Sequence, residues 1–381
     1  MKLKLQNVTR KLLLLAAGVG TAASLFGATS DSRKPSAGAV FVMTNDATTN
    51  EVISFGRTPD GQLAPGDRFR TGGRGSGGTV DPLQSQGSLI LSQDRSMLFA
   101  ANAGSGTVSV FRVRVASLTL MDQAASGGSE PLSIAQNGNF VYVLNGAAAG
   151  SVVAFQWDGR KLRQVPNSTS FLSATSAGGS SVTISPDGKT LVVTERLTND
   201  IDTFQIRPDG TLGPIVVNTS KAPGVFAASF APDGAVLVSE TGPANVPNSS
   251  AISSYSVLTN GTISAISQSV PTLGAANCWN AVAPNGLWVY VSNSASNSVS
   301  GFTIGSGGTL TPIGGTLLGS NPAGSTNLDI AVSSDSSFVY TLNSGAGAIG
   351  IFAIQNDGSL ISLGEVDGLP KAAGFNGIAA L

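Results

Sequence analysis

Two glutamates, Glu195 and Glu240, end consecutive copies of a repeated apolar run, in a column where the other copies end in Asn. Two carboxyl groups that crowd each other push their pKa values apart, so one can take up a proton while the other stays charged. Arg196 follows Glu195 directly and would bind an anionic substrate or stabilise an oxyanion. These three residues are predicted to be catalytic. An interpretation of equal weight is that each glutamate only caps its loop by bonding to local backbone, as Asn does elsewhere.

The sequence contains no histidine and a single cysteine, Cys278. Histidine is the commonest general base and metal ligand, so its absence excludes any Ser-His-Asp scheme. Cys278 could act as a nucleophile, but no histidine stands ready to activate it, and a buried inert thiol is favoured. A lone cysteine also excludes an internal disulfide.

The elements that must position these residues recur along the chain. An Asp- or Asn-containing turn falls at Asp94, Asn137, Asp187, Asp233, Asn285 and Asp335, at intervals of 43 to 52 residues. Each turn is followed by an apolar strand: MLFAAN, FVYVLN, TLVVTE, AVLVSE, WVYVSN and FVYTLN, with a further copy, AVFVMTN, ahead of the first turn. Repeats of this length predict propeller blades or solenoid units.

Each repeat is predicted to contribute four antiparallel strands. The third strand carries an aromatic residue in all seven copies: Phe55, Phe111, Phe155, Phe204, Tyr255, Phe302 and Phe352. This pattern predicts an all-β fold, a seven-bladed β-propeller over residues 38–381, whereas a parallel β-helix would need much shorter repeats. The chain ends on a lone first strand, residues 377–381, which is expected to pair into the N-terminal blade and close the ring.

In such a blade the first strand begins, and the second strand ends, on the same face of the ring. Loops at this channel mouth are where a ligand site is expected. The substrate-binding residues predicted there are Gln86, Cys278, Trp279, Asn280, Asp329 and Asn376. Trp279 could stack on a sugar ring, the alternative being a buried wedge between blades. Asp329, Glu195 and Glu240 could also hold Ca²⁺ or another divalent cation through their oxygens, although no fixed spacing supports a metal site.

Three arginines, Arg68, Arg70 and Arg74, lie in or beside a Gly-rich segment, residues 71–78. The segment lacks the Lys-Ser/Thr ending of a phosphate-binding loop. It is therefore predicted to be a flexible connection between blades, beside which the arginines could contact an anion.

Residues 1–28 have the pattern of a secretory signal peptide, with basic residues, a short apolar run and small residues at the exit. The run is too short for a membrane anchor. After a linker at 29–37, the mature chain is expected to be secreted, periplasmic or cell-surface, monomeric and without a membrane span. It would keep 17 positive and 22 negative side chains, a net charge of −5. The absence of a basic excess argues against nucleic acid as a partner.

The segments SPDGKTLVVTERLTNDIDTFQI, APDG and CWNAVAPNG resemble the lactonase-type seven-bladed propeller family. This family includes bacterial 6-phosphogluconolactonase and the fungal carboxymuconate lactonising enzyme. The segments TGG-x-GSGG, SQG, VVTE and CW resemble its exported members, sometimes described as haemagglutinin-like. The resemblance implies a site of His, Glu and Arg at the channel mouth. Glu195, Arg196 and Glu240 could match the acidic and basic members, but no residue supplies the histidine.

Two functions follow as hypotheses. The first is an exported lactonase-like hydrolase acting on a sugar-acid or related lactone, with Glu195 or Glu240 as base. The second is a non-catalytic extracellular propeller that binds glycan, cell-wall polymer or protein at the same mouth. Paired glutamates and the family resemblance favour catalysis, whereas missing histidine, low charge and export favour binding.

Overall fold

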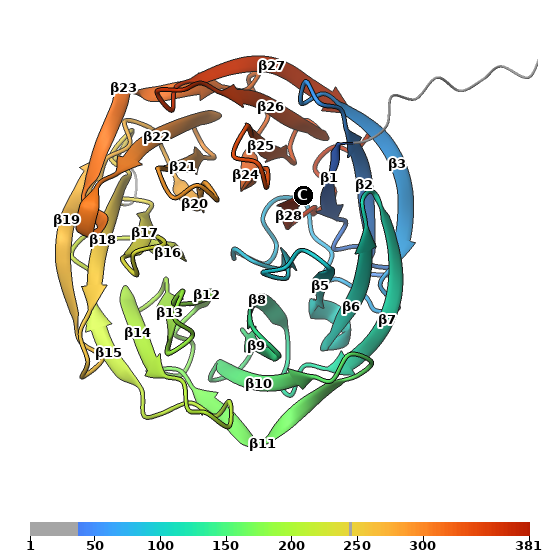
Figure 1. Cartoon of the computed structure of the whole chain (residues 1–381), viewed down its shortest axis with the longest axis vertical. Coiled ribbons are helices and arrows are strands. Elements are labelled where there is room, and N and C mark those ends of the chain that lie inside the picture. Colours follow the sequence, from blue (N-terminus) through green and yellow to red (C-terminus); the bar gives the residue numbers. More distant parts are fainter. Residues whose placement is uncertain (1–36, 244–245) are drawn as a thin grey trace, which may run out of the picture. The chain divides into compact units, whose positions relative to one another are not determined.

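The computed structural model describes residues 37–243 and 246–381. The predicted signal peptide (1–28), and the predicted linker (29–37) except for its last residue, lie outside the described residues. Within the described ranges, 28 strands form seven four-stranded antiparallel sheets around a central space (Figure 1). The predicted seven-bladed β-propeller is therefore confirmed. No helix in these ranges is long and apolar enough to cross a membrane.

The blades are numbered along the chain, and their strands run from the centre of the ring outward. Blade 1 contains β28 (Ile378–Ala380), β1 (Gly38–Met43), β2 (Glu51–Arg57) and β3 (Leu63–Arg70). Blade 2 contains β4 (Leu89–Leu91), β5 (Met97–Asn102), β6 (Thr107–Arg114) and β7 (Ser117–Ala125). Blade 3 contains β8 (Pro131–Asn137), β9 (Phe140–Asn145), β10 (Ser151–Trp157) and β11 (Leu162–Phe171). Blade 4 contains β12 (Gly179–Ile184), β13 (Thr190–Glu195), β14 (Asp200–Gln205) and β15 (Val216–Thr219).

The last three blades have the same order. Blade 5 contains β16 (Val225–Phe230), β17 (Val236–Glu240), β18 (Ala251–Val257) and β19 (Ile263–Pro271). Blade 6 contains β20 (Asn277–Val282), β21 (Trp288–Asn293), β22 (Ser298–Ile304) and β23 (Leu310–Ser320). Blade 7 contains β24 (Asn327–Val332), β25 (Phe338–Asn343), β26 (Ala348–Ile354) and β27 (Leu360–Asp367). Two short 3₁₀ turns, Ala103–Ser105 and Ser306–Gly308, complete the described elements.

The ring closes where the end of the chain pairs into the first blade. β28 pairs antiparallel with β1, with Val40 opposite Ala380 and Val42 opposite Ile378. Closure of the ring removes the open edge that an unpaired inner strand would present. The predicted closing strand is confirmed.

The aromatic column of the third strands packs between blades. All seven rings are at most 1% exposed, and all belong to the apolar clusters of the ring. At three junctions a tyrosine on a second strand also donates a hydrogen bond to the third-to-fourth-strand turn of the next blade. These bonds run from Tyr142 to Gly210 O (3.0 Å), from Tyr290 to Gly358 O (2.8 Å) and from Tyr340 to Gly61 O (3.1 Å).

Candidate functional site

The first strands begin where the second strands end, as the repeat predicted. Gly179 lies opposite Glu195, Val225 opposite Glu240 and Asn277 opposite Asn293. We call this end of the central channel the loop mouth, and the opposite end, beside the Asp- and Asn-containing turns, the turn mouth.

A segment of blade 2, residues 79–88, leaves its own blade and crosses the channel, where its chain reaches into the middle of the ring (Figure 1). The inner strand β4 is correspondingly short, with only three residues. The segment bonds to blades 3, 4 and 6. These bonds are Ser85 Oγ to Leu132 O (2.8 Å), Gln86 N to Ser180 O (2.9 Å), Trp279 Nε1 to Ser85 O (2.9 Å) and Asn280 N to Gln86 Oε1 (2.9 Å). The segment thus separates two pockets.

The loop-mouth pocket has a volume of about 340 Å³ and is lined by Asp81, Gln84, Arg196, Thr241 and Cys278, together with Val80 and residues 224–226. Asp81 is half-buried, and burial raises its pKa to about 7. The charge of Arg196 and a 3.1 Å hydrogen bond from Asn376 Nδ2 oppose this rise. A carboxyl group that titrates near neutral pH therefore shares a small pocket with a cation.

The turn-mouth pocket is larger, about 660 Å³, and takes residues from blades 1, 2, 4, 5, 6 and 7. Three predicted site residues, Gln86, Asn280 and Asp329, line it. Asp329 is 3% exposed and accepts hydrogen bonds from Ile330 N (2.9 Å) and Ile378 N (3.2 Å). Burial raises the pKa of Asp329 to about 7. The side chains of Gln86 and Asn280 are both engaged in bonds within the protein.

Glu195 points into the junction between blades 3 and 4 and has no exposed surface. It accepts hydrogen bonds from Ser173 N (2.8 Å) and Thr198 Oγ1 (2.7 Å). Burial opposes its ionisation, but hydrogen bonds from Asp202, Ser173 and Thr198 outweigh that effect and hold the pKa of Glu195 below its ordinary value. Burial, with the hydrogen bond and charge of Glu195, raises the pKa of Asp202 to about 9. The proton of this pair therefore resides on Asp202.

Glu240 has the corresponding place one blade further on. It is fully buried and accepts a hydrogen bond from Ser220 Oγ (3.2 Å). Burial raises the pKa of Glu240 to about 7. Hydrogen bonds with Ser253, Ser220 and Tyr255 lower the pKa but do not outweigh burial. Glu240 is also among the lining residues of a separate pocket of about 320 Å³, with Lys221 and Asn248.

The two glutamates belong to a contact that recurs between blades. A residue just after the outer strand of one blade bonds to the residue that ends the second strand of the next. Examples run from Asn145 Nδ2 to Ser126 O, from Ser173 N to Glu195 Oε1, from Ser220 Oγ to Glu240 Oε1 and from Asn343 Nδ2 to Asn321 Oδ1. Glu195 and Glu240 therefore make the contacts that Asn makes elsewhere, and neither lines the loop-mouth or the turn-mouth pocket. Of the three predicted catalytic residues, only Arg196 lies at the channel mouth.

The remaining predicted residues, Cys278, Trp279 and Asn376, lie against or beside the crossing segment. Trp279 is 1% exposed and packs edge-on against Phe226, with ring centroids 5.2 Å apart, so its face offers no platform for a sugar. Cys278 is 8% exposed, and burial raises the pKa of its thiol. Asn376 is 1% exposed and accepts a hydrogen bond from Ser88 Oγ (3.0 Å) while donating to Asp81.

Sequence reasoning missed Asp81 and Asp202. Asp202 lies two residues before Phe204. The same position in blades 2 and 6 is occupied by Ser109 and Ser300. Both serines accept a hydrogen bond from the Asn that ends the second strand. An Asp in this column, in a blade whose second strand ends in Glu, was therefore a visible exception. Asp81 lies in the connection to blade 2, which has no counterpart in the repeat.

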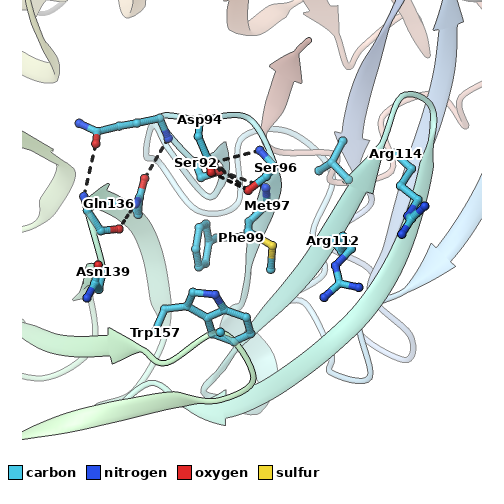
Figure 2. A pocket seen from close by; sticks show the side chains of 14 residues that line it. Ser92, Asp94, Ser96, Met97, Phe99, Arg112, Arg114, Gln136, Asn139 and Trp157 are labelled. Atoms are coloured by element: carbon cyan, nitrogen blue, oxygen red, sulfur yellow. Dashed lines mark hydrogen bonds between the residues drawn. The ribbon is translucent and has the colours of Figure 1, made fainter.

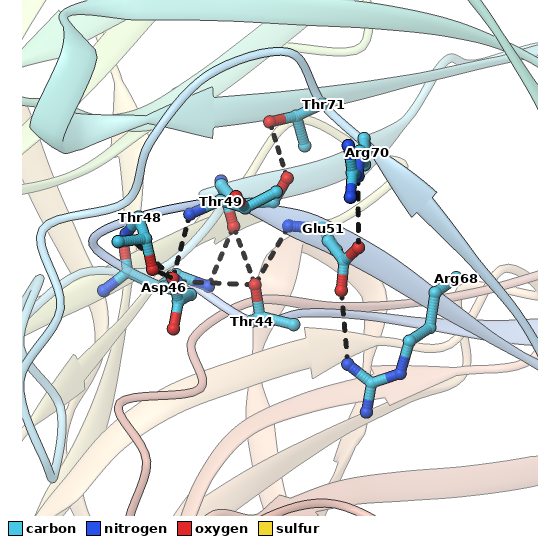
Figure 3. A network of polar contacts seen from close by, with 10 residues as sticks. Thr44, Asp46, Thr48, Thr49, Glu51, Arg68, Arg70 and Thr71 are labelled. Carbon is cyan, nitrogen blue, oxygen red and sulfur yellow. Dashed lines mark hydrogen bonds and ion pairs between the residues drawn. The ribbon is translucent and has the colours of Figure 1, made fainter.

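The residues predicted to bind Ca²⁺, and the arginines predicted to contact an anion, do not form binding sites among the described residues. Within residues 37–243 and 246–381, no three His, Cys, Asp or Glu side chains come close enough to hold a metal ion, so the predicted Ca²⁺ ligands Glu195, Glu240 and Asp329 do not form one site. Arg68 and Arg70 both pair with Glu51, at 3.3 Å and 4.0 Å, beside the polar loop of blade 1 (Figure 3). Neither arginine is therefore a free anion contact.

The Gly-rich segment connects blades 1 and 2, as predicted, but it is tightly packed where a flexible connection was expected. Gly75 N donates to Asp46 O (2.7 Å), and a side chain at Gly73 would collide with Asn102.

Comparison with known proteins agrees with this architecture. No curated protein matches the sequence significantly. A putative 6-phosphogluconolactonase from Bacteroides uniformis is 16% identical, with a TM-score of 0.67 over 90% of this chain and 99% of that one. A periplasmic gluconolactonase from Pseudomonas aeruginosa is 18% identical, with a TM-score of 0.65 over 88% and 98%. A hypothetical selenium-binding protein from Sulfolobus tokodaii is 11% identical, with a TM-score of 0.62 over 91% and 94%.

At these identities the solved structures share the fold and do not establish the activity. The family model described as lactonase, seven-bladed β-propeller, matches residues 132–278 and 281–367, more than half of the chain. The protein therefore belongs to the seven-bladed β-propeller lactonase family.

Proposed function

We propose that the protein hydrolyses a sugar-acid or related lactone in the loop-mouth pocket. The observation that carries this proposal is that Asp81 and Arg196 share that pocket, with the pKa of Asp81 raised to about 7. A general base works best when its pKa lies near the working pH. The volume of about 340 Å³ is also suited to a single small ring.

The reaction requires a base, a water molecule and a group that accepts developing negative charge. Ionised Asp81 would take a proton from water as the water oxygen attacks the lactone carbonyl carbon. The guanidinium of Arg196 would stabilise the resulting oxyanion, or hold a carboxylate of the substrate. As the ring C–O bond breaks, the leaving alkoxide would recover the proton from Asp81, giving the hydroxy acid. No histidine is needed for this sequence.

The earlier assignment of Glu195 or Glu240 as the base remains an alternative proposal. Either glutamate would first have to lose its inter-blade contacts, because neither has exposed surface. Asp81 needs no such rearrangement, since it already lines the pocket.

A panel of γ- and δ-lactones of sugar acids, followed by acid release, tests the proposal. We expect turnover that Asp81→Asn lowers by about 100-fold, while Glu195→Gln and Glu240→Gln retain it. Unchanged turnover in Asp81→Asn would refute the assignment of Asp81. Loss of turnover in a folded Glu240→Gln or Glu195→Gln would instead support the glutamate alternative. Running the panel with and without EDTA tests a requirement for a divalent cation.

A second proposal is that the protein binds a glycan, cell-wall polymer or protein without catalysis. The larger turn-mouth pocket, which combines apolar strand residues with the polar Thr183 and Ser229, favours it. An inactive lactone panel together with retention on a glycan array would support this function. The pattern of residues 1–28 supports export in either case, and the closed ring suits a monomer.

A further inference from the structure

A pocket of about 670 Å³ opens between blades 2 and 3, away from the loop mouth (Figure 2). Its walls include Met97 and Phe99 on β5, Arg112 and Arg114 on β6, and Trp157 at the end of β10. No proposed step of lactone hydrolysis uses these residues.

The pocket exists because this junction lacks a contact that fills the corresponding junctions. In blades 1, 4, 5, 6 and 7 the turn between the third and fourth strands closes over five residues, as from Arg207 N to Thr211 O. In blade 3 the turn closes over four, from Asp158 N to Lys161 O (3.1 Å). The base of the shorter turn is tied to blade 2 by an ion pair between Lys161 and Asp122 on β7 (2.7 Å), but its tip at Gly159 stays clear of that blade.

The preceding blade has matching changes. In blades 1, 4 and 7 the turn glycine touches an aromatic ring of the preceding blade: Gly61 against Phe338, Gly210 against Phe140 and Gly358 against Trp288. At Gly159 of blade 3, an added side chain would meet nothing within 4 Å. Blade 2 also has Phe99 in the column of Tyr142 and Tyr290, so it has no hydroxyl to donate to the turn.

The side chains that line this pocket combine an aromatic and apolar surface with charged and amide groups. Trp157 is half-buried, in a column that is aliphatic in blades 2, 4, 5, 6 and 7. Figure 2 shows Trp157, Phe99 and Met97 in the middle of the pocket, Arg112 and Arg114 on one side, and Gln136 and Asn139 on the other. Both arginines are exposed, and neither forms an ion pair with any residue of the described ranges.

Two carboxylates, Asp94 and Asp158, lie near the arginines, and one of them is paired with another cation. Asp94 accepts hydrogen bonds from Ser92 Oγ (2.6 Å) and from Ser96 N (3.1 Å) and Oγ, which lower its pKa. Asp158, beside Trp157, pairs with Arg163 at 2.9 Å. The lining of the pocket therefore carries two positive charges, on Arg112 and Arg114, against the single negative charge of Asp94.

We infer that this pocket between blades 2 and 3 binds an acidic saccharide, the uronate unit of an oligosaccharide. The apolar face of the sugar ring would pack on Trp157, whose large flat surface suits such contact. The carboxylate would take the fork-like donors of Arg112 or Arg114. The side-chain amide of Asn139, which has no hydrogen-bond partner among the described residues, would bond to a hydroxyl group of the sugar.

Tryptophan fluorescence with trigalacturonate as the probe tests the inference on the full-length protein. Trp279 and Trp288 are 1% and 9% exposed, so a change on titration would report Trp157. We expect saturable binding, weakened roughly tenfold or more by Arg112→Gln or Arg114→Gln through loss of a charged hydrogen bond. The matched control is Arg70→Gln, an exposed arginine on blade 1, which should bind as the unaltered protein does.

A second variant closes the pocket without touching either arginine. Replacing residues 159–160 by Pro-Asp-Gly lengthens the turn to five residues and keeps Asp158 and Lys161, which pair with Arg163 and Asp122. This variant should abolish binding while the melting temperature is kept. The inference is overturned if trigalacturonate gives no saturable change up to about 10 mM. It is also overturned if neutral galactotriose binds equally well, or if Arg70→Gln weakens binding as much as Arg112→Gln does.

Discussion

Asp202 lies beside Glu195 inside blade 4, and the two carboxyl groups share one proton that Asp202 holds. The pair replaces the Asn-Ser contact of blades 2 and 6. Its proton makes the stability of this blade junction depend on pH.

The first prediction concerns that dependence. The pKa of Asp202 is raised to about 9, so the folded state keeps a proton that the unfolded state loses above its ordinary pKa near 3.8. Its stabilising contribution is therefore complete below that ordinary value and is lost as pH rises towards 9. Glu195 acts in the opposite sense, and its contribution is lost only in acid. We expect Asp202→Asn, which keeps a donor towards Glu195, to flatten the fall in melting temperature between pH 7.5 and 9.5.

The control for this measurement is Asp67→Asn, an exposed aspartate on β3. The other carboxyl groups with a raised pKa, those of Asp81, Glu240 and Asp329, have pKa values of about 7. Above pH 7.5 they are largely ionised and contribute little to the change of melting temperature with pH. A slope that is the same in Asp202→Asn and in the unaltered protein would show that Asp202 does not hold the proton.

The second prediction is a pH profile for lactone hydrolysis. If ionised Asp81 is the base, kcat/KM rises with pH through a value of about 7 and levels off above it. Arg196 lowers the pKa of Asp81, so Arg196→Gln should move the rise to higher pH as well as lower the rate. Arg196→Lys keeps the charge and should keep the position of the rise. A profile that stays in place in Arg196→Gln would contradict electrostatic coupling of the two residues.

The third prediction concerns ring closure. Asp329 accepts a hydrogen bond from Ile378 N on the closing strand, at 3.2 Å, and from Ile330 N, at 2.9 Å. Asp329→Ala would leave these buried donors unsatisfied, which should cost about 2 kcal/mol or more. Urea unfolding measures the loss, and hydrogen exchange at Ile378 locates it. Ser256→Ala, at a half-buried position near the end of β18, serves as the comparison and should change stability by less than about 0.5 kcal/mol.

The fourth prediction separates the structural and catalytic interpretations of Glu240. Glu240→Gln keeps the shape and can still accept from Ser220 while removing the carboxyl that burial holds at a pKa of about 7. We expect the variant to be at least as stable as the unaltered protein at pH 8, because ionising a buried carboxyl destabilises the folded state. Thermal unfolding at pH 5 and pH 8 tests this, and a large loss of stability at pH 8 would mean that the charge of Glu240 is required.

The architecture could be predicted from the sequence because each blade is specified locally, by its turns, its alternating strands and its aromatic column. The positions of Glu195 and Glu240 along the strands were also predictable. The direction of their side chains was not, because it depends on Ser173 and Ser220, which follow the outer strands of other blades. The loop-mouth pocket was harder still. Its candidate base, Asp81, lies on a segment whose path is fixed by partners on blades 3, 4 and 6.

Because residues 79–88 cross the channel, they also restrict the passage of solutes from one mouth to the other. Its bonds to Ser180, Trp279 and Asn280 place backbone between the two pockets. A solute that reaches Asp81 from the loop mouth meets a dead end and must leave by the way it entered. Substrate and product would therefore enter and leave through the same opening. The two mouths of the channel could also bind different ligands that do not pass from one to the other.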